Sequence, residues 1–148
     1  MVRDWDSVIA YIREHTEITN VLLSGGDPLV LQTRYLQDML QRLAGIEHLQ
    51  YVRIGTRIPV VLPQRISEDA SLHEAFREFL AHGKQLYITT QYNHARELTS
   101  ESLEAIRRLR ENGLIALGKG ADPDIITASA KAYINGLNRL EYLKNHPV

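Results

Sequence analysis

The chain of 148 residues contains no cysteine. This absence excludes disulfides, thiolate metal sites and cysteine nucleophiles. Six histidines are present, but apart from His94, which lies in a candidate loop described below, they show no metal-ligand spacing among themselves. We therefore predict no metal-binding residues in this chain.

The chain also lacks long apolar runs and an excess of one charge. No run approaches the ~20 residues that a membrane span needs, and the N-terminus lacks the apolar stretch of a signal peptide. With 17 basic and 18 acidic residues, no global field favours nucleic acid or an anionic membrane. We expect a cytoplasmic protein of one globular domain whose partner is a small molecule, with no nucleic acid and no membrane.

Short apolar segments alternate with stretches in which apolar residues recur at helical spacing. Such alternation predicts βαβ units and a parallel sheet. The expected fold class is α/β: a parallel sheet of about four strands with helices, forming a partial (βα) barrel arc. A small doubly wound sheet and an arc completed by a second copy remain alternatives, since four strands cannot close an eight-stranded barrel. The predicted strands are residues 21–24, 51–54, 86–89 and 114–117, and the predicted helices lie near residues 5–12, 33–43, 71–80, 99–109 and 122–140.

Several residues predict where these elements begin and end. Thr33 is expected to cap the second helix, and Ser71 has capping-box spacing to Glu74 at the start of the third. Gly55 is expected to break the second strand. The remaining boundary residues are Gly45, Gly83 and Gly113 as helix ends and Thr99 or Ser100 as a helix start. Residues 59–63 are expected to be a packed connection and not a site.

Ligands of parallel sheets bind beyond the carboxyl ends of the strands, and all four predicted ends are polar. Together they offer backbone N–H groups, a carboxylate, an arginine, a lysine and an imidazole. This set suits an anionic or zwitterionic small molecule. The four ends are Ser24 to Asp27, residues 55–57, residues 89–94 and residues 118–120.

Each of these features also has a structural interpretation. The Gly25-Gly26-Asp27 loop is either a ligand loop or a strand-to-helix turn, although two glycines exceed what a turn needs. Asp27 either accepts bonds from nearby N–H groups or an amine, or caps the following segment. Arg57 is an anion clamp or a solvated loop residue, and His94 alone is more often structural.

The amino-acid sequences of several segments closely resemble those of the lysine 2,3-aminomutase family. The resemblance covers residues 4–117 in order, and its longest and most specific part is the stretch 53–66. The segments that carry it are residues 11–16 (YIREHT), 21–29 (VLLSGGDPL), 53–66 (RIGTRIPVVLPQRI), 92–94 (YNH) and 97–99 (ELT).

This resemblance implies a radical S-adenosylmethionine (SAM) protein with a partial barrel, an iron–sulfur cluster and pyridoxal phosphate. It implies that Asp27, with the backbone of Ser24, Gly25 and Gly26, holds the methionine amino group of SAM. The loop of Gln91, Asn93 and His94 would face the same ligand, with a contact changed at Gln91, where many relatives have histidine. Arg57 would bind an anionic group.

The chain departs from that family in two ways. The Cys-x3-Cys-x2-Cys cluster motif is expected before residue 4, and the segments that supply substrate carboxylates and the lysine for pyridoxal phosphate are expected after residue 117. Without cluster thiolates there is no electron donor to cleave SAM. We therefore expect no catalytic residues and no catalysis from this chain alone, with SAM as its one potential cofactor.

Residues 118–140 resemble the end of the C-terminal regulatory domain of 2-isopropylmalate synthases. We therefore expect residues 1–117 to form the partial barrel and residues 118–148 a C-terminal helical segment packed on the same domain. Open sheet edges favour a homodimer. Two alternatives stay open beside the aminomutase-like fragment: a non-catalytic small-molecule-binding or regulatory module, and a recombined scaffold without a natural function.

Overall fold

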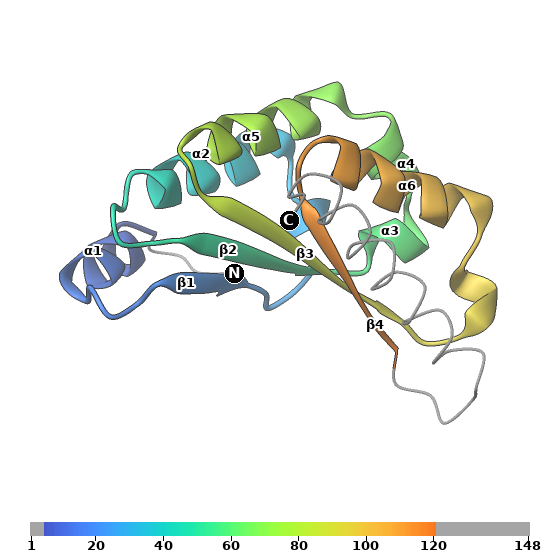
Figure 1. The fold of residues 1–148 in the computed structure, drawn as a ribbon, viewed down its shortest axis with the longest axis horizontal. Coiled ribbons are helices and arrows are strands. Elements are labelled where there is room, and N and C mark those ends of the chain that lie inside the picture. The colour runs from blue at the N-terminus through green and yellow to red at the C-terminus, as the bar shows by residue number, and fades with distance from the viewer. Residues whose placement is uncertain (1–4, 121–148) are drawn as a thin grey trace, which may run out of the picture.

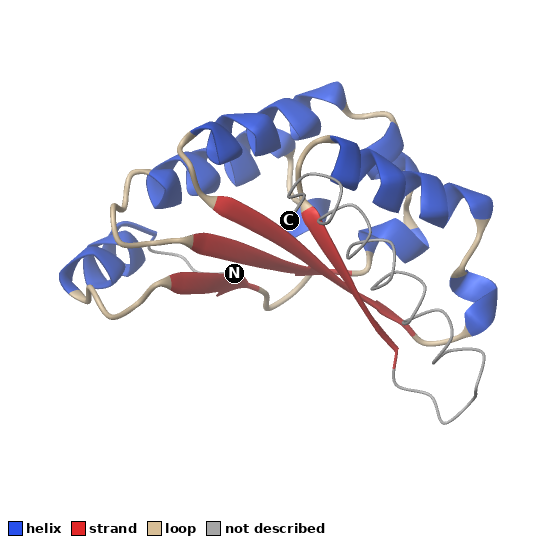
Figure 2. Cartoon of the chain, in the orientation of Figure 1, coloured by secondary structure: helices blue, strands red, loops and turns tan. Residues whose placement is uncertain are grey.

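A computed structural model describes residues 5–120 of the chain; for residues 119 and 120 it describes the backbone alone. Helices and strands alternate along this part (Figure 2). The elements are α1 (Trp5–Glu14), β1 (Asn20–Leu23), η1 (Pro28–Val30), α2 (Thr33–Ala44), β2 (Tyr51–Thr56), α3 (Ile58–Val61), α4 (Gln64–Ser67), α5 (Ala70–Ala81), β3 (Gln85–Tyr92), η2 (Ala95–Glu97), α6 (Ser100–Glu111) and β4 (Ile115–Gly120).

The described sheet has four parallel strands in the order β1-β2-β3-β4. Each strand pairs with the next one in the sequence, so every connection is a crossover to a neighbouring strand. Helices α2, α5 and α6 lie over one face of this sheet (Figure 1). Helices on both faces would mark a doubly wound sheet. The predicted α/β class and the arc-like arrangement are therefore confirmed.

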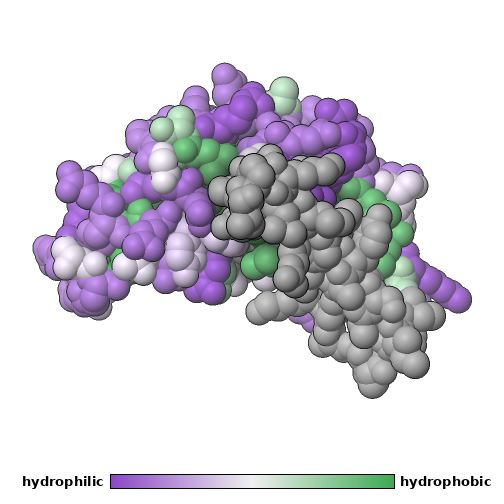
Figure 3. Space-filling model, in the orientation of Figure 1, coloured by the Kyte–Doolittle hydropathy of each residue, from purple (hydrophilic) through white to green (hydrophobic). Residues whose placement is uncertain are grey.

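Period-two burial along the strands places the core between the sheet and these helices. Alternate side chains of β2 and β3, such as Ile54 and Ile88, are fully buried, and they pack with Phe76 and Phe79 of α5. The opposite face carries Leu22, which is 51% exposed. The described surface in the view of Figure 3 is mostly hydrophilic, as expected for side chains outside that core.

The helix boundaries follow the sequence only in part. Gly45 caps the C-terminus of α2, and Thr99 caps α6 by accepting a hydrogen bond from the backbone N–H of Ser102 at 3.1 Å, both as predicted. The expected cap at Thr33 is wrong, because the N-cap is Gln32 and the Thr33 hydroxyl donates instead to Asp69 at 2.9 Å.

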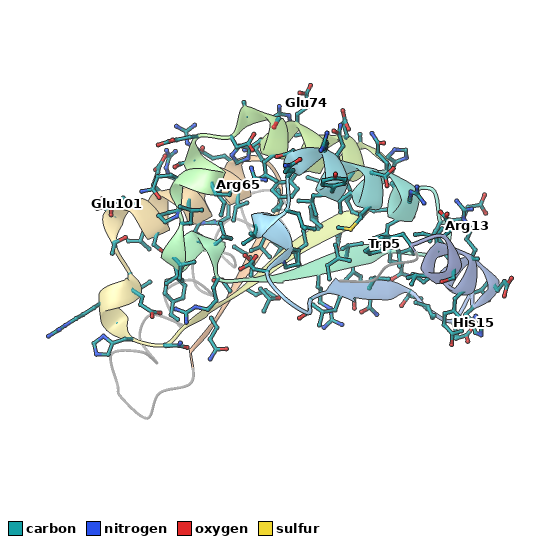
Figure 4. All side chains as sticks on the ribbon, turned by 180° about the vertical axis from the view of Figure 1, so that it is seen from behind. Trp5, Arg13, His15, Arg65, Glu74 and Glu101 are labelled. Atoms are coloured by element: carbon teal, nitrogen blue, oxygen red, sulfur yellow. The ribbon has the colours of Figure 1, made fainter. Side chains whose placement is uncertain are left out.

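The expected capping box at Ser71 is also wrong. Helix α5 begins one residue earlier, and its N-cap is Asp69, which accepts from the backbone N–H of Leu72 at 3.1 Å. The Ser71 hydroxyl donates to the same carboxylate at 2.5 Å. Glu74 points away from the helical layer (Figure 4). Serine and aspartate are comparable N-caps, but Asp69 is also held by the Thr33 hydroxyl and by Arg65, which favours the earlier start.

The last three strands are longer than predicted. Gly55 continues β2 instead of breaking it, since it pairs in register with Thr89 of β3. Strand β3 runs through Gln91 to Tyr92, and β4 runs on to Gly120. Polar residues stay extended here because the neighbouring strand satisfies their backbone groups.

The connection at residues 59–63 is helical in part, since residues 59–61 belong to α3 and Pro63 is the N-cap of α4. Ile58 and Pro59 are buried, but Val61 and Leu62 are 62% and 49% exposed, so the expected packing holds for one side only. The helix expected at 122–140, and with it the predicted C-terminal segment, lies outside the described residues. Within residues 5–120, no helix combines the length and hydrophobicity that a membrane crossing requires.

Candidate functional site at the carboxyl ends of the strands

The loop after β1 needs two glycines because of its backbone angles. Gly25 has φ +90° and Gly26 has φ +120°, a region that residues with a Cβ rarely adopt. A Cβ built on either glycine would meet nothing within 4 Å, so space is not the constraint. Both residues, like Ser24, are exposed. The loop therefore presents backbone groups to its surroundings.

Asp27 ties this loop to β2. Its carboxylate accepts hydrogen bonds from the Leu29 backbone N–H at 3.0 Å, the Thr56 hydroxyl at 2.6 Å and the Arg57 backbone N–H at 2.7 Å. The first of these bonds caps η1, which agrees with the prediction that Asp27 caps the segment after the loop. Since a carboxylate has about four acceptor sites, one remains for a further donor.

Arg57 lies directly after β2 and pairs with Glu97 of η2, with 2.9 Å between Nη2 and Oε1. The other carboxylate oxygen of Glu97 accepts from the Asn93 backbone N–H at 2.7 Å. Burial alone would raise the pKa of Glu97, but the hydrogen bond from Asn93 and the charge of Arg57 lower it. Within the described part of the chain, the buried Nε of Arg57 has no hydrogen-bond partner.

The three predicted residues near the end of β3 differ in their surroundings. Gln91 belongs to β3 itself and not to the loop, and its side chain is exposed. Asn93 and His94 follow the strand and are also exposed. His94 Nδ1 accepts from the backbone N–H of Arg96 at 3.0 Å and so caps η2. His94 therefore has a structural contact and leaves Nε2 available.

These contacts link the carboxyl ends of β1, β2 and β3, and we call the linked surface the rim. It consists of Ser24, Gly25, Gly26, Asp27, Thr56, Arg57, Asn93, His94 and Glu97. The structure thus brings most of the predicted site residues together. The predicted contribution of Lys119, near the end of β4, concerns a side chain outside the described residues.

Two rim residues were not among the residues predicted to bind a ligand, although residue 56 lay within the predicted polar strand end 55–57. Thr56 has a recognisable signal, because it continues the alternation of Val52 and Ile54 and a buried hydroxyl requires a partner. Glu97 has no such signal, since it lies 40 residues from Arg57 in the sequence. Thr56 and Glu97 are the groups that fix Asp27 and Arg57.

A second cluster holds the segment after the loop in place. Arg65 of α4 donates from Nε to the Leu29 carbonyl at 3.1 Å and from Nη2 to the Leu31 carbonyl at 3.0 Å. It also donates to the Thr33 hydroxyl at 2.9 Å and forms an ion pair with Asp69. The Arg65 side chain is 16% exposed, and Figure 4 labels this residue among the helices. Arg65 thereby anchors η1, which begins directly after Asp27.

No group of three or more potential metal ligands occurs in residues 5–120. The cysteines that would hold an iron–sulfur cluster are absent from the whole sequence. The donor set of this chain therefore does not fit such a cluster. The groups left to contact a small organic ligand are the exposed loop backbone, the remaining acceptor site of Asp27 and the Nε of Arg57, which has no partner within residues 5–120.

Comparison with known proteins confirms both resemblances. The chain is 44% identical over 114 residues to a putative L-lysine 2,3-aminomutase of Aquifex aeolicus, which covers 76% of this chain and 30% of that protein. It is 41% identical over 109 residues to the L-lysine 2,3-aminomutase of Bacillus subtilis (74% and 22%) and 38% identical over 135 residues to the glutamate 2,3-aminomutase of Clostridioides difficile (91% and 28%). The chain therefore spans less than a third of the length of these three relatives.

The model of the LeuA allosteric (dimerisation) domain matches residues 73–141. This range begins well before Gly118, where the sequence alone suggested that the second resemblance starts. The two resemblances therefore overlap in α5, β3, α6 and β4 instead of meeting at one junction.

Proposed function

We propose that this chain is the SAM-binding strand-end part of an aminomutase-like radical barrel, and that the rim binds the methionine moiety of SAM. The observation that carries the proposal is the linkage of Asp27 to Thr56 and Arg57, and of Arg57 to Glu97. These bonds fix an exposed glycine backbone at the carboxyl ends of the strands, where parallel α/β proteins bind ligands.

The charges of the rim are complementary to a free amino acid moiety. Asp27 retains about one acceptor site for an ammonium group. Arg57 forms an ion pair with Glu97, but its Nε has no partner in the described part of the chain and would donate to the carboxylate of that moiety. The N–H groups of Gly25 and Gly26 lie between the strand end and Asp27, where a carboxylate oxygen would accept from them.

The chemistry that follows SAM binding is not assigned to this chain. In the resembled family a cluster held by cysteines donates the electron, and this sequence has no cysteine. Pyridoxal phosphate is assigned no residue either. The proposal is therefore restricted to binding, and the amino-group migration of the relatives belongs to a system that supplies the cluster from elsewhere.

An NMR-monitored titration of the isotope-labelled chain with SAM tests this proposal. We expect the amide signals of Gly25 and Gly26 to shift and to saturate at millimolar SAM. His94→Ala is expected to weaken binding about threefold or more through loss of one polar contact. Arg96→Ala is the matched control, because this exposed residue lies in the same turn but contributes only its backbone N–H to the rim. Unshifted glycine signals at millimolar SAM would rule the proposal out.

A second candidate function is that of a regulatory or dimerisation module. The match to the LeuA allosteric (dimerisation) domain over residues 73–141 favours it. The described sheet also ends in two strands, β1 and β4, that each have one neighbour. This candidate predicts a homodimer.

A further inference from the structure

A hollow of about 230 Å³ lies in the helical layer, away from the rim. Its residues come from α5, α6 and the segment from the end of α4 to the start of α5, and these elements are neighbours in Figure 1. The volume is below the roughly 300–1,000 Å³ of sites for drug-sized ligands, so it suits a small ion or one functional group. The lining residues are Ser67, Glu68, Ala70, His73, Arg77, Arg108 and Asn112.

Two arginines from different helices share this hollow. Arg77 of α5 donates from Nη1 to Asn112 Oδ1 at 2.6 Å, and Arg108 of α6 donates from Nε to Glu104 at 2.9 Å. Among the described residues, the other N–H groups of both guanidinium groups have no partner. Both side chains reach solvent, which screens part of their mutual repulsion, and an anion between the two guanidinium groups would reduce it further.

The carboxylates nearby do not remove this excess of donors. Glu104 forms ion pairs with both Arg107 and Arg108, so it only partly offsets the charge of Arg108. Glu68 lines the hollow, but none of the described ion pairs joins it to Arg77 or Arg108. Glu68 therefore leaves both guanidinium groups available, and its own charge offsets part of their attraction for an anion.

The buried side of the hollow is formed by His73, which is 8% exposed. Its Nε2 lies 2.6 Å from the Ile66 carbonyl oxygen, and its ring packs edge-on against Phe76. These two contacts fix the ring. The remaining nitrogen, Nδ1, is buried and has no partner within the described part of the chain, which is uncommon for a buried polar group.

We propose that this hollow is a binding site for a small oxyanion, a phosphate or carboxylate group, held between Arg77 and Arg108. Guanidinium groups match such anions with paired, charge-assisted hydrogen bonds. Because Nε2 of His73 donates to the Ile66 carbonyl, Nδ1 of the neutral ring is an acceptor, so the protonated oxygen of a hydrogen phosphate or of a carboxylic acid would donate to it. The ring signals of His73 would report the bound group. The site is separate from the rim and does not depend on the function proposed for it.

A titration of the isotope-labelled full chain with inorganic phosphate at constant ionic strength tests this site. We expect saturable shifts of the Arg77 and Arg108 Nε–H signals and of the His73 ring signals, with Gly25 and Gly26 unchanged. Arg77→Gln and Arg108→Gln are each expected to weaken binding at least about fivefold, because each removes a charge-assisted donor pair. Arg107→Gln is the matched control, because Arg107 lies on the same helix but does not line the hollow.

The outcomes separate the site from general attraction of anions. Equal weakening by Arg107→Gln, or full affinity in Arg77→Gln with an unchanged melting temperature, would overturn the proposal. Arg77→Lys, which keeps the charge but not the fork, is expected to give an intermediate affinity. Titrations with acetate and glycerol phosphate then identify the source of the oxyanion, since a phosphate monoester that binds more tightly than free phosphate indicates a phosphorylated metabolite.

Discussion

Asp69 joins several segments through one carboxylate. It accepts hydrogen bonds from Ser71, Thr33 and the Leu72 backbone, and it forms an ion pair with Arg65. Burial alone would raise its pKa, but the three hydrogen bonds and the charge of Arg65 lower the pKa from 3.8 to about 2. The ionised form is therefore the form that the fold stabilises.

This shift predicts a pH-dependent effect of Asp69→Asn, which keeps a capping group but removes the charge. Because the folded pKa is depressed, the stabilisation is complete above the unfolded pKa near 3.8 and is lost as the pH falls towards 2. We expect a loss of about 1–2 kcal/mol in the free energy of unfolding at pH 7. Urea titrations at several pH values should show this loss shrinking between about pH 4 and pH 2. A loss that stays constant down to pH 2, or an equal loss in the exposed control Asp38→Asn, would contradict the prediction.

A second prediction at the residue scale concerns the glycine loop. Gly26→Ala is expected to lower the free energy of unfolding by about 1–2 kcal/mol, because an alanine is strained at φ +120°. Since no atom lies within 4 Å of the added Cβ, the whole effect comes from the backbone. Gly45→Ala is the control, because Gly45 has a φ of −75° and the atom nearest to an added Cβ would lie 3.7 Å away. Urea unfolding of both variants measures the difference, and equal stabilities would argue against the strained loop.

At the scale of elements, Arg65 connects α4 to η1 and to the start of α2. Its side chain is 16% exposed, and its donors satisfy two backbone carbonyls as well as Asp69. We expect Arg65→Lys to cost about 2–4 kcal/mol, because an ammonium cannot reproduce the fork and leaves acceptors unsatisfied. Arg107→Lys, in an exposed ion-pair cluster, should cost less than about 1 kcal/mol.

Hydrogen exchange identifies which element Arg65 holds. The amides of Val30 and Leu31, which bond to Asp27 and Pro28, should exchange faster in Arg65→Lys. Protection in α6 should be unchanged. A uniform loss of protection in both elements would indicate general destabilisation and not the anchoring of η1.

The extent to which the sequence predicted these elements depends on how local their causes are. Strands and helices were found because apolar periodicity reports which face is buried, as at Val52 and Ile54. Strand ends were placed too early at Gly55 and after Thr89, because pairing with the neighbouring strand overrides local propensity. The cap of α5 was missed because Asp69 is stabilised by Thr33 and Arg65, and the former lies 36 residues away.

The same distinction applies to the rim. Asp27 and Arg57 were predictable because glycines and polar residues follow buried strands in the sequence. Their partner Glu97 was not, because its role depends on how β2 and β3 are placed side by side. The hollow between α4, α5 and α6 also arises only in the folded chain, where Arg77 and Arg108 converge from separate helices.

At the scale of the whole molecule, the described sheet has one covered face and two edges. The helices cover the face that carries Ile54 and Ile88, while Leu22 of the edge strand β1 lies on the other face. Unpaired strand edges favour association with another chain. The match to a dimerisation domain over residues 73–141 also favours a homodimer, although it does not include β1. We therefore predict a homodimer whose interface includes the edge strand β1 and the sheet face that carries Leu22.

Leu22→Lys tests that interface directly. The wild-type chain is expected to sediment as a dimer, and the charge introduced on the edge strand should shift the equilibrium towards the monomer by about tenfold or more, since burial of an unpaired ammonium is costly. Leu22 is 51% exposed in the single chain, so the monomer itself should keep its stability. Leu103→Lys is the control, because Leu103 is 38% exposed on α6, within the helical layer. A wild-type chain that stays monomeric at high concentration would exclude an interface at β1, and so would a dimer that both substitutions weaken equally. In either case the rim would bind its ligand within a single chain.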